Sequence, residues 1–567
     1  MSFGMTEWWR RSTVYQVYPR SFKDTTGNGI GDIRGVTEKL DYLQELGIDI
    51  VWLQPVYVSP QNDNGYDVAD YRSIDPMYGT MDDFDELMSS LRKRNMRMML
   101  DIVVNHSSTD HIWFQQARSS RDNPYRDYYI WRDPAPDGGL PNNWQSKFGG
   151  SAWQYDEPTG QYYLALFDST QADLNWEHEQ VRHEAADLMR FWTDKGVDGF
   201  RLDVINLISK DQDFPNDTNS DLLVSDGRRF YTDGPRVHEY IKELYENVFG
   251  PHRLVTVGEM SSTTLQHCIR YSNPDEREFS MTFNFHHLKV DYPQGRKWEL
   301  MPYDFEALKN LLSEWQTGMY IGGGWNALFW NNHDQPRALS RFADDGRYRV
   351  ASAKMLATTL HGLQGTPYVF QGEEIGMPNP HWNDITEFRD IESKNMYRIM
   401  IEMGKTPEEA FTIIARRSRD NARTPMQWNY SANAGFTDGT PWIKVDERYP
   451  EINAELQQHD PYSVFSHYKT LIRLRKTEDV LTDGQYIRID EQHPQVYAYA
   501  RRNAVDTLIV VSNFTDQPAQ FTPSAVYVDS NDIASMELLA GNTEQIPVWD
   551  TTVYLEPYGS YMWVIRG

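Results

Sequence analysis

Three acidic residues stand at or near the carboxyl ends of apolar runs in this sequence: Asp203, Glu259 and Asp334. A retaining glycosidase needs one carboxylate as nucleophile and a second carboxyl group as proton donor, about 5–5.5 Å apart. The apolar neighbours of Glu259 would raise its pKa and keep a proton ready for a leaving oxygen. The three acids therefore indicate glycoside chemistry.

Other polar residues accompany these acids. Asp101 and His106 frame the end of another apolar run, and Arg201 and His333 each stand within two residues of an acid. A guanidinium beside Asp203 would favour its charged form. The histidines could hydrogen-bond sugar hydroxyls, since their spacing is not that of a zinc site. A single buried Asp or His is usually structural, but several at strand ends cost free energy unless a ligand or counter-ion uses them, which favours a functional site.

The runs that carry these residues alternate with helical patterns. The apolar runs cover residues 49–53, 98–105, 199–205, 254–259, 327–334 and 366–370. They are continuous and do not alternate with polar residues, which suggests parallel strands buried on both faces. Helical spacing between them covers residues 36–43, 84–91 and 181–192. This order predicts an α/β fold, and in a parallel barrel the strand ends would bring the polar residues to one face.

Two long interruptions and a change of pattern divide the chain. Residues 107–175 are rich in Asp, Pro, Gly, Trp and Tyr and indicate an inserted domain after the third strand, and a second insertion covers about 379–461. Short alternating runs after residue 481 predict an antiparallel β domain over 481–567. We therefore assign residues 1–106 and 176–480 to the barrel.

Composition limits the classes of partner. The 567 residues have a net charge of −27, which disfavours nucleic acids and anionic membrane surfaces. No run approaches about 18 apolar residues, and residues 1–11 contain no apolar segment of signal-peptide length. The one cysteine, Cys268, cannot form an intramolecular disulfide and is expected to be a buried apolar residue. We expect a cytoplasmic protein that is a monomer or a weak dimer.

Aromatic residues make up 13% of the chain, with 18 Trp, 34 Tyr and 24 Phe. Most of them are expected in the core. Sugars, however, present flat C–H faces with a polar rim, which suit aromatic rings placed beside polar side chains. The composition therefore gives carbohydrate binding a modest advantage over other small-molecule functions.

The motifs resemble those of the α-amylase superfamily, glycoside hydrolase family 13. Four segments are similar, in order, to its signature regions: DIVVNH at 101–106, GFRLDV at 199–204, VGEM at 257–260 and NNHD at 331–334. QADLNW at 171–176 resembles an additional region of the oligo-1,6-glucosidase branch, with Ala172 as the departure. The likeness runs nearly end to end, through 365–374 to 418–428. It implies a (β/α)8 TIM barrel with a domain inserted after strand 3 and a C-terminal antiparallel β domain.

The resemblance also implies roles for individual residues. Asp203 would be the nucleophile, Glu259 the acid/base and Asp334 the stabiliser of the transition state. A basic residue closes the non-reducing end of the pocket in the family, and Arg423 matches it better than Arg419 does. The implied substrate-binding residues are Tyr66, Asp67, His106, Phe167, Arg201, His333 and Arg423. Such a closed pocket implies exo-action on short substrates.

Within this branch the segments 226–236, 260–264 and 281–292 are similar to those of hydrolases that act on trehalose 6-phosphate. A phosphate entering so acidic a protein needs local Arg or Lys donors. The candidate phosphate-binding residues are Lys289, Arg228, Arg229 and His287, with Arg296 and Lys297 nearby. The expected partner is thus a sugar phosphate, although any one of these residues could belong to a solvated basic loop.

Two other functions stay open. A neutral exo-α-glucosidase of the oligo-1,6 type is favoured by Val204, which family members active on α-1,6 bonds tend to carry after the nucleophile. A binding protein without catalysis would normally have lost one of the acids Asp203, Glu259 and Asp334, and all three are present.

A Gly-rich loop at 24–32 is a candidate cation site. Hard cations prefer oxygen ligands, and oxygen-bearing side chains recur through this loop. The candidate ligands are Asp24, Thr26, Asn28, Ile30 and Asp32. The resemblance implies Ca2+ or Mg2+ here, although relatives often have Asp in place of Asn28, and a plain turn is the alternative. No organic cofactor is expected.

Overall fold

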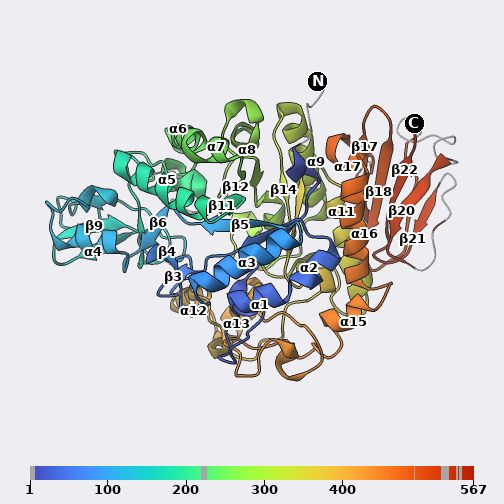
Figure 1. Ribbon diagram of the computed structural model, residues 1–567, viewed down its shortest axis with the longest axis horizontal. Helices are drawn as coiled ribbons and strands as arrows, with labels where there is room; N and C mark the ends of the chain where they lie inside the picture. The colour runs from blue at the N-terminus through green and yellow to red at the C-terminus, as the bar shows by residue number, and fades with distance from the viewer. Residues whose placement is uncertain (1–6, 219–225, 491, 525–534, 544–546, 548–551) are drawn as a thin grey trace.

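An eight-stranded parallel sheet forms the centre of the computed structural model, which describes residues 7–218, 226–490, 492–524, 535–543, 547 and 552–567 (Figure 1). Its strands are β1 (Val14–Val17), β2 (Ile50–Leu53), β5 (Arg97–Ile102), β11 (Gly199–Leu202), β12 (Val255–Glu259), β13 (Met281–Phe283), β14 (Ala327–Leu328) and β15 (Thr366–Phe370). They pair in the order β13-β12-β11-β5-β2-β1-β15-β14. A parallel bridge between Thr282 and Asn326 joins β13 to β14 and closes the sheet into a barrel. The predicted (β/α)8 TIM barrel is therefore confirmed.

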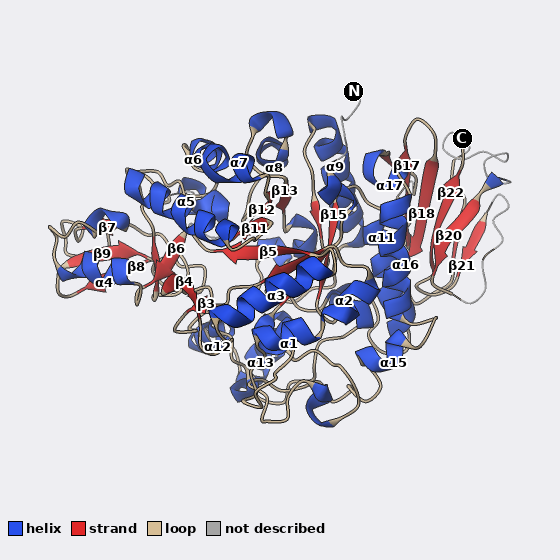
Figure 2. Cartoon of the chain, viewed as in Figure 1, coloured by secondary structure: helices blue, strands red, loops and turns tan. Residues whose placement is uncertain are grey.

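Helices surround these strands (Figure 2). The principal ones are α1 (Ile33–Glu38), α2 (Leu40–Leu46), α3 (Met81–Lys93), α5 (Glu179–Asp194), α6 (Val237–Leu244), α8 (Leu265–Ser272), α9 (Phe305–Gly322), α11 (Arg349–His361) and α16 (Val464–Thr477). Local sequence sets their ends: Thr80 and Asp83 form a capping box at the start of α3, and Gly47 ends α2 at φ 97°. Every residue of β1, β2, β11, β12 and β15 is buried, which explains their continuous apolar sequences.

The first insertion follows β5. Strand β6 (His106–Ser108) pairs with β10 (Gln171–Asp173), and between them lie α4 (Ile112–Ser119) and an antiparallel sheet of β7 (Trp131–Arg132), β9 (Gln161–Leu164) and β8 (Trp153–Asp156). Its core around Trp144 and Trp153 includes Val204 and Leu207 from the loop after β11. The insertion is thus packed directly against the end of the strand that carries Asp203.

The second insertion and the C-terminal domain complete the fold. Between β15 and α16 lie α12 (Ile391–Glu402), α13 (Pro407–Arg417), α14 (Asp420–Arg423) and α15 (Ala454–Gln458). The C-terminal sheet has the order β16 (Gln485–Arg488), β17 (Val496–Arg502), β18 (Thr507–Asn513), β22 (Ser560–Ile565) and β20 (Glu537–Gly541), beside a pair of β19 (Ala519–Phe521) and β21 (Val553–Leu555). All its described pairings are antiparallel, so the predicted β domain is confirmed. It lies across the barrel from the first insertion (Figure 1).

No helix in the described part of the chain is both long and apolar enough to cross a membrane. Cys268 is buried and free, as its sequence context suggested.

Candidate active site

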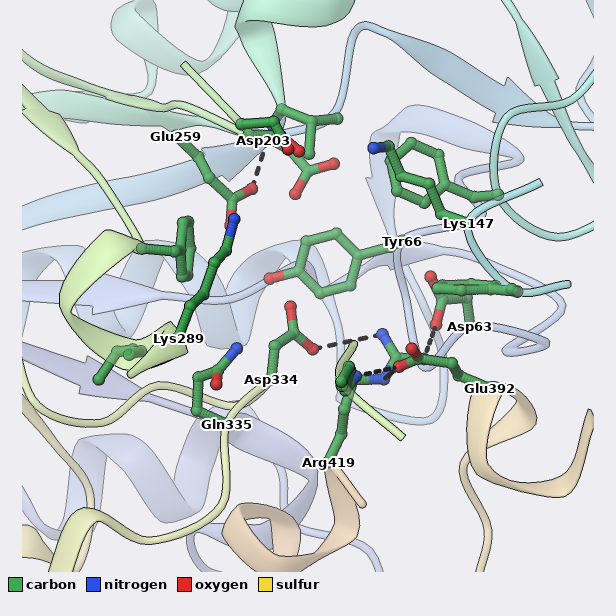
Figure 3. Close-up of a pocket in the computed structure, with 18 of the residues that line it drawn as sticks. Asp63, Tyr66, Lys147, Asp203, Glu259, Lys289, Asp334, Gln335, Glu392 and Arg419 are labelled. Atoms are coloured by element: carbon green, nitrogen blue, oxygen red, sulfur yellow. Dashed lines mark hydrogen bonds and ion pairs between the residues drawn. The ribbon is translucent and has the colours of Figure 1, made fainter. Parts of the chain in front are cut away.

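A pocket of about 250 Å³ opens at the carboxyl ends of the barrel strands (Figure 3). Strand ends, both insertions and the loop after β13 all contribute to its wall. Of the residues predicted from sequence, it is lined by Tyr66, His106, Phe167, Asp203, Glu259, Lys289 and Asp334. Three acids from separate strands thus meet around one cavity, the place where a barrel assembles chemistry.

Arg201 joins three carboxylates beneath this pocket. Its side chain is 1% exposed, with Nη1 2.8 Å from Asp101 Oδ1 and 2.6 Å from Asp203 Oδ1. Its Nη2 lies 2.5 Å from Glu259 Oε2. The guanidinium charge is therefore shared among three acids, of which Asp203 is one. The same contacts hold Asp203 and Glu259 next to each other.

Asp203 and Glu259 hold protons more tightly than ordinary carboxyl groups. Burial raises the pKa of Glu259 to about 8 and that of Asp203 to about 7, against the opposing charge of Arg201. A hydrogen bond from Glu259 lowers the pKa of Asp203, whereas the charge of Asp203 raises the pKa of Glu259, so the proton of the pair belongs on Glu259. This division suits a nucleophile and a proton donor.

The backbone of Val204 helps to place Glu259. Val204 has φ 37° and ψ 38°, a left-handed conformation that is strained for a β-branched residue. In this conformation its N–H donates to Glu259 Oε2 at 3.1 Å. Strain at this residue therefore accompanies a direct contact with the proposed acid, as is common at functional sites.

Asp334 lies among basic groups and stays ionised. Its Oδ1 is 2.8 Å from Arg423 Nη2, and its Oδ2 is 3.2 Å from His333 Nε2. Burial would raise the pKa of Asp334, but His333, Arg419 and Arg423 outweigh it and hold that pKa well below its usual range. His333 lies behind the wall and stacks on the ring of Tyr66, with centroids 5.0 Å apart and planes 5° apart. It supports Tyr66 and Asp334 from below.

The basic residue at the closed end is Arg419, and the preference for Arg423 was wrong. Arg419 lines the pocket, where its guanidinium lies 2.9 Å from Asp63 and 2.6 Å from Asp390. Arg423 is fully buried, and its Nε donates to the carbonyl of His333 at 3.0 Å. Arg419 directly precedes α14 and reaches the cavity, whereas Arg423 ends that helix beneath Asp334.

Asp67 was also predicted wrongly, and Asp63 takes its place in the wall. Asp67 has no exposed surface and accepts hydrogen bonds from Ser59 Oγ at 2.9 Å and the Asn62 N–H at 2.8 Å. It accepts a further bond from the Asp63 N–H at 3.1 Å, so it fixes the turn that presents Asp63 to the cavity. Because Asp63 lies one residue before the motif NGYD, its position in the sequence could have drawn attention to it.

Three of the four candidate phosphate ligands face other groups. Arg228 pairs with Asp226 at 2.6 Å and Arg229 with Asp217 at 3.0 Å. His287 Nε2 lies 2.9 Å from the carbonyl of Phe329, and burial lowers its pKa to about 4, which leaves it neutral. None of the three lines the pocket. In this structure local acceptors use the charge or the N–H of each side chain, and a role of these three residues in phosphate binding stays a prediction.

Lys289 does line the pocket, and Lys147 of the first insertion joins it there (Figure 3). Burial, assisted by the positive charge of Arg228, lowers the pKa of each to about 8. Within the described residues neither ammonium forms an ion pair with a carboxylate. Lys297 also lines the pocket but is paired with Glu392 at 2.6 Å, and Arg296 is paired with Glu299 outside it. Sequence reasoning missed Lys147, because no spacing marks a single lysine in an aromatic-rich insertion.

The loop at 24–32 is held by its own hydrogen bonds. Asp24 accepts from the N–H groups of Thr26, Gly27 and Gly29 at 2.8–2.9 Å and from the Thr437 hydroxyl at 2.5 Å. Asp32 accepts from the Gly35 N–H at 2.7 Å and caps α1. The described residues hold no cluster of three or more His, Cys, Asp or Glu side chains arranged for a metal. An ion here would have to displace some of the bonds to Asp24.

Comparison with known proteins covers almost the whole chain. The alpha amylase catalytic domain matches residues 16–484, and the maltogenic amylase C-terminal domain matches residues 487–562. The chain is 58% identical over 522 residues to the trehalose-6-phosphate hydrolase of Bacillus subtilis (strain 168), covering 92% of each. It is 52% identical over 516 residues to an oligo-1,6-glucosidase of Parageobacillus thermoglucosidasius, covering 91% of this chain and 92% of that one. The crystal structure of Bacillus licheniformis trehalose-6-phosphate hydrolase matches with a TM-score of 0.93 and 55% identity, covering 99% of this chain and 100% of the other.

Proposed function

The chain belongs to the alpha-amylase family, and we propose that it is a retaining hydrolase that cleaves trehalose 6-phosphate into glucose and glucose 6-phosphate. One observation carries this choice of substrate: two ammonium groups without a carboxylate partner among the described residues, Lys147 and Lys289, line the same pocket as the three acids. A neutral disaccharide could accept hydrogen bonds from them but would leave their positive charge uncompensated. A phosphate dianion would supply the missing negative charge.

In the proposed mechanism, Asp203 attacks the anomeric carbon of the bound glucose while Glu259 donates its proton to the glycosidic oxygen. The departing sugar leaves with that proton, and a glucosyl ester forms on Asp203. Glu259, now a carboxylate, takes a proton from water as the water attacks the same carbon and releases Asp203. Asp334, ionised and held by Arg419 and Arg423, would stabilise positive charge that develops at the anomeric carbon.

The two ends of the pocket would divide the substrate. Asp63 and Arg419 occupy one end, and the carboxylate of Asp63 would repel a phosphate placed there. Lys289 lines the same pocket as Glu259 and, in the view of Figure 3, lies on the opposite side from Asp63 and Arg419. We therefore infer that the unphosphorylated glucose occupies the closed end and that glucose 6-phosphate is the leaving group.

The deciding experiment compares kcat/KM for trehalose 6-phosphate, trehalose and isomaltose. We expect a preference for the phosphorylated sugar, and a preference for either neutral sugar would reject the proposal. The second candidate is a neutral oligo-1,6-glucosidase. Val204 and the 52% identity to an oligo-1,6-glucosidase favour it, and it predicts that isomaltose is the best substrate.

We also propose a structural Ca2+ or Mg2+ at the 24–32 loop, supported by two buried carboxylates, Asp24 and Asp32, that bond to adjacent residues of one loop. Chelation should then remove about one ion per chain and lower Tm by about one to three degrees. A metal-free protein with an unchanged Tm would refute the ion. A cytoplasmic location and a monomeric or weakly dimeric state remain predictions.

A further inference from the structure

A buried carboxylate lies directly behind the loop that carries Lys289. Asp291 is 5% exposed and stands two residues after Lys289. It accepts hydrogen bonds from Arg341 Nε at 2.8 Å and Nη2 at 2.6 Å, and from Arg417 Nη1 at 2.6 Å. None of the three side chains lines the pocket. Asp291 is therefore the common partner of two buried guanidinium groups that the proposed mechanism does not use.

Arg341 connects this carboxylate to the loop after β14. It belongs to α10 (Ala338–Phe342), which follows Asp334 in the chain. Besides Asp291, it donates to the carbonyl of Leu288 and, from Nη1, to Gln335 Oε1 at 3.0 Å. Both Leu288 and Gln335 line the pocket. Arg341 therefore ties the Lys289 loop to the loop that carries Asp334.

Arg417 connects the same carboxylate to the second insertion. It is the last residue of α13, two residues before Arg419. Its Nη2 donates to the carbonyl of Asp291 at 2.5 Å and to that of Glu299 at 2.9 Å. The guanidinium carbon also lies 4.9 Å from the ring centre of Tyr292, which lines the pocket. Arg417 thus holds both ends of the loop from Asp291 to Glu299.

We propose that Asp291 is a positioning residue that sets the place of Lys289 for a phosphorylated substrate, an inference that rests on the proposed function. Without the carboxylate, Arg341 and Arg417 would be two buried like charges without their shared partner, and the loop from Leu288 to Glu299, whose carbonyls they hold, would shift. Lys289 is on that loop, whereas Asp203, Glu259 and Asp63 are on other elements. Asp334 and Arg419 adjoin the bonded segments but keep ion pairs of their own, to Arg423 and to Asp63, which a change at Asp291 leaves in place. The effect should therefore fall on phosphate recognition and spare the hydrolysis of a neutral glucoside.

The first test is D291N, assayed with trehalose 6-phosphate and with p-nitrophenyl α-glucoside. We expect kcat/KM for the phosphorylated sugar to fall by about tenfold or more, mainly through KM, because small displacements of binding groups are costly. The neutral glucoside should change by less than about threefold. The matched control is D156N, since Asp156 is also buried and pairs with Arg118 at 2.8 Å, but lies outside the pocket. D156N should leave the ratio of the two activities unchanged.

The second test is a double-mutant cycle with K289A. If Asp291 acts through Lys289, D291N should lower the phosphate preference of the K289A enzyme by less than about twofold. Should D291N fail to fold, R341K replaces it in both tests. Lysine keeps the positive charge at this position but cannot make the paired hydrogen bonds that the guanidinium of Arg341 donates to Asp291. The proposal would be overturned if D291N left the ratio of the two activities unchanged, as equal losses on both substrates would. It would also be overturned if the effects of D291N and K289A on that ratio multiplied in full. A wild-type enzyme that prefers trehalose would instead reject the proposed function before any variant is compared.

Discussion

The carboxylate of Asp63 lies 2.9 Å from the guanidinium of Arg419 and closes one end of the pocket with an ion pair. The two residues are far apart in sequence: Asp63 lies between β3 (Tyr57–Val58) and β4 (Asp70–Ile74), and Arg419 belongs to the second insertion. Burial raises the pKa of Asp63 to about 6 even though Arg419 opposes it. The pair therefore forms a polar wall that a sugar hydroxyl can contact. A longer sugar chain could not extend past this wall.

Arg419→Ala should remove this wall and its contacts. Loss of one partner leaves Asp63 buried without its counter-ion, a cost of about 3–5 kcal/mol when the pair is buried. We expect kcat/KM to fall by about two to three orders of magnitude for every α-glucoside, phosphorylated or not. Steady-state kinetics on trehalose 6-phosphate and p-nitrophenyl α-glucoside would measure this. A loss confined to the phosphorylated sugar would contradict the assignment of this end to the unphosphorylated glucose.

Asp203→Asn should abolish turnover. An amide cannot form the proposed glucosyl ester, so kcat should fall by several orders of magnitude while the fold is retained. Proton NMR during wild-type hydrolysis should show α-glucose as the first product, since two displacements retain the configuration. Initial β-glucose, or a nearly normal rate in the variant, would overturn the mechanism.

Lys289→Ala and Lys147→Ala should each weaken recognition of the phosphate. A charge-assisted hydrogen bond contributes about 1.5–3 kcal/mol, so kcat/KM for trehalose 6-phosphate should fall by about 10–100-fold. The rate with a neutral glucoside should change little. Arg229→Ala is the control, because Arg229 pairs with Asp217 outside the pocket. If Arg229→Ala reduced the preference as much as the lysine variants do, the proposed phosphate site would be in the wrong place.

The pH dependence should differ between the two kinds of substrate. Glu259 must be protonated to act as an acid, and its pKa is raised to about 8, so activity falls on the alkaline side as the pH rises through that value. Lys147 and Lys289, with pKa values lowered to about 8, lose their charge over the same range. The alkaline slope of log kcat/KM should be about −1 for a neutral glucoside and steeper for trehalose 6-phosphate. Parallel alkaline limbs would count against the two lysines as phosphate ligands.

Hydrolysis in 18O-labelled water should show which glucose passes through the covalent intermediate. Water attacks the sugar held on Asp203, which we place at the closed end. The label should therefore enter glucose and not glucose 6-phosphate, as mass spectrometry of the products can measure. Label in glucose 6-phosphate would mean that the phosphate lies beside Asp63 and Arg419.

The sequence by itself determined the architecture. Continuous apolar runs separated by helical spacing indicated an α/β fold with parallel strands buried on both faces, and the resemblance to the α-amylase superfamily added that the strands form a (β/α)8 barrel. The same argument brought Asp203, Glu259 and Asp334 together, because each follows a strand and all such strands end at one face of a barrel. These deductions succeeded because periodicity and position along a strand are local properties of the chain.

Only the tertiary structure decided which neighbours of these acids reach the cavity. Asp63 and Asp67 are close together in one turn, as are Arg419 and Arg423 around one short helix, yet in each pair one side chain lines the pocket and the other supports it from behind. Whether a cation is available for a ligand was likewise not a local property. Arg228 pairs with Asp226 two residues away, but Arg229 pairs with the more distant Asp217, and Lys147 and Lys289 reach one pocket from an insertion and a distant loop. Side-chain direction and charge pairing depend on contacts between segments far apart in the chain, and spacing along it does not encode them.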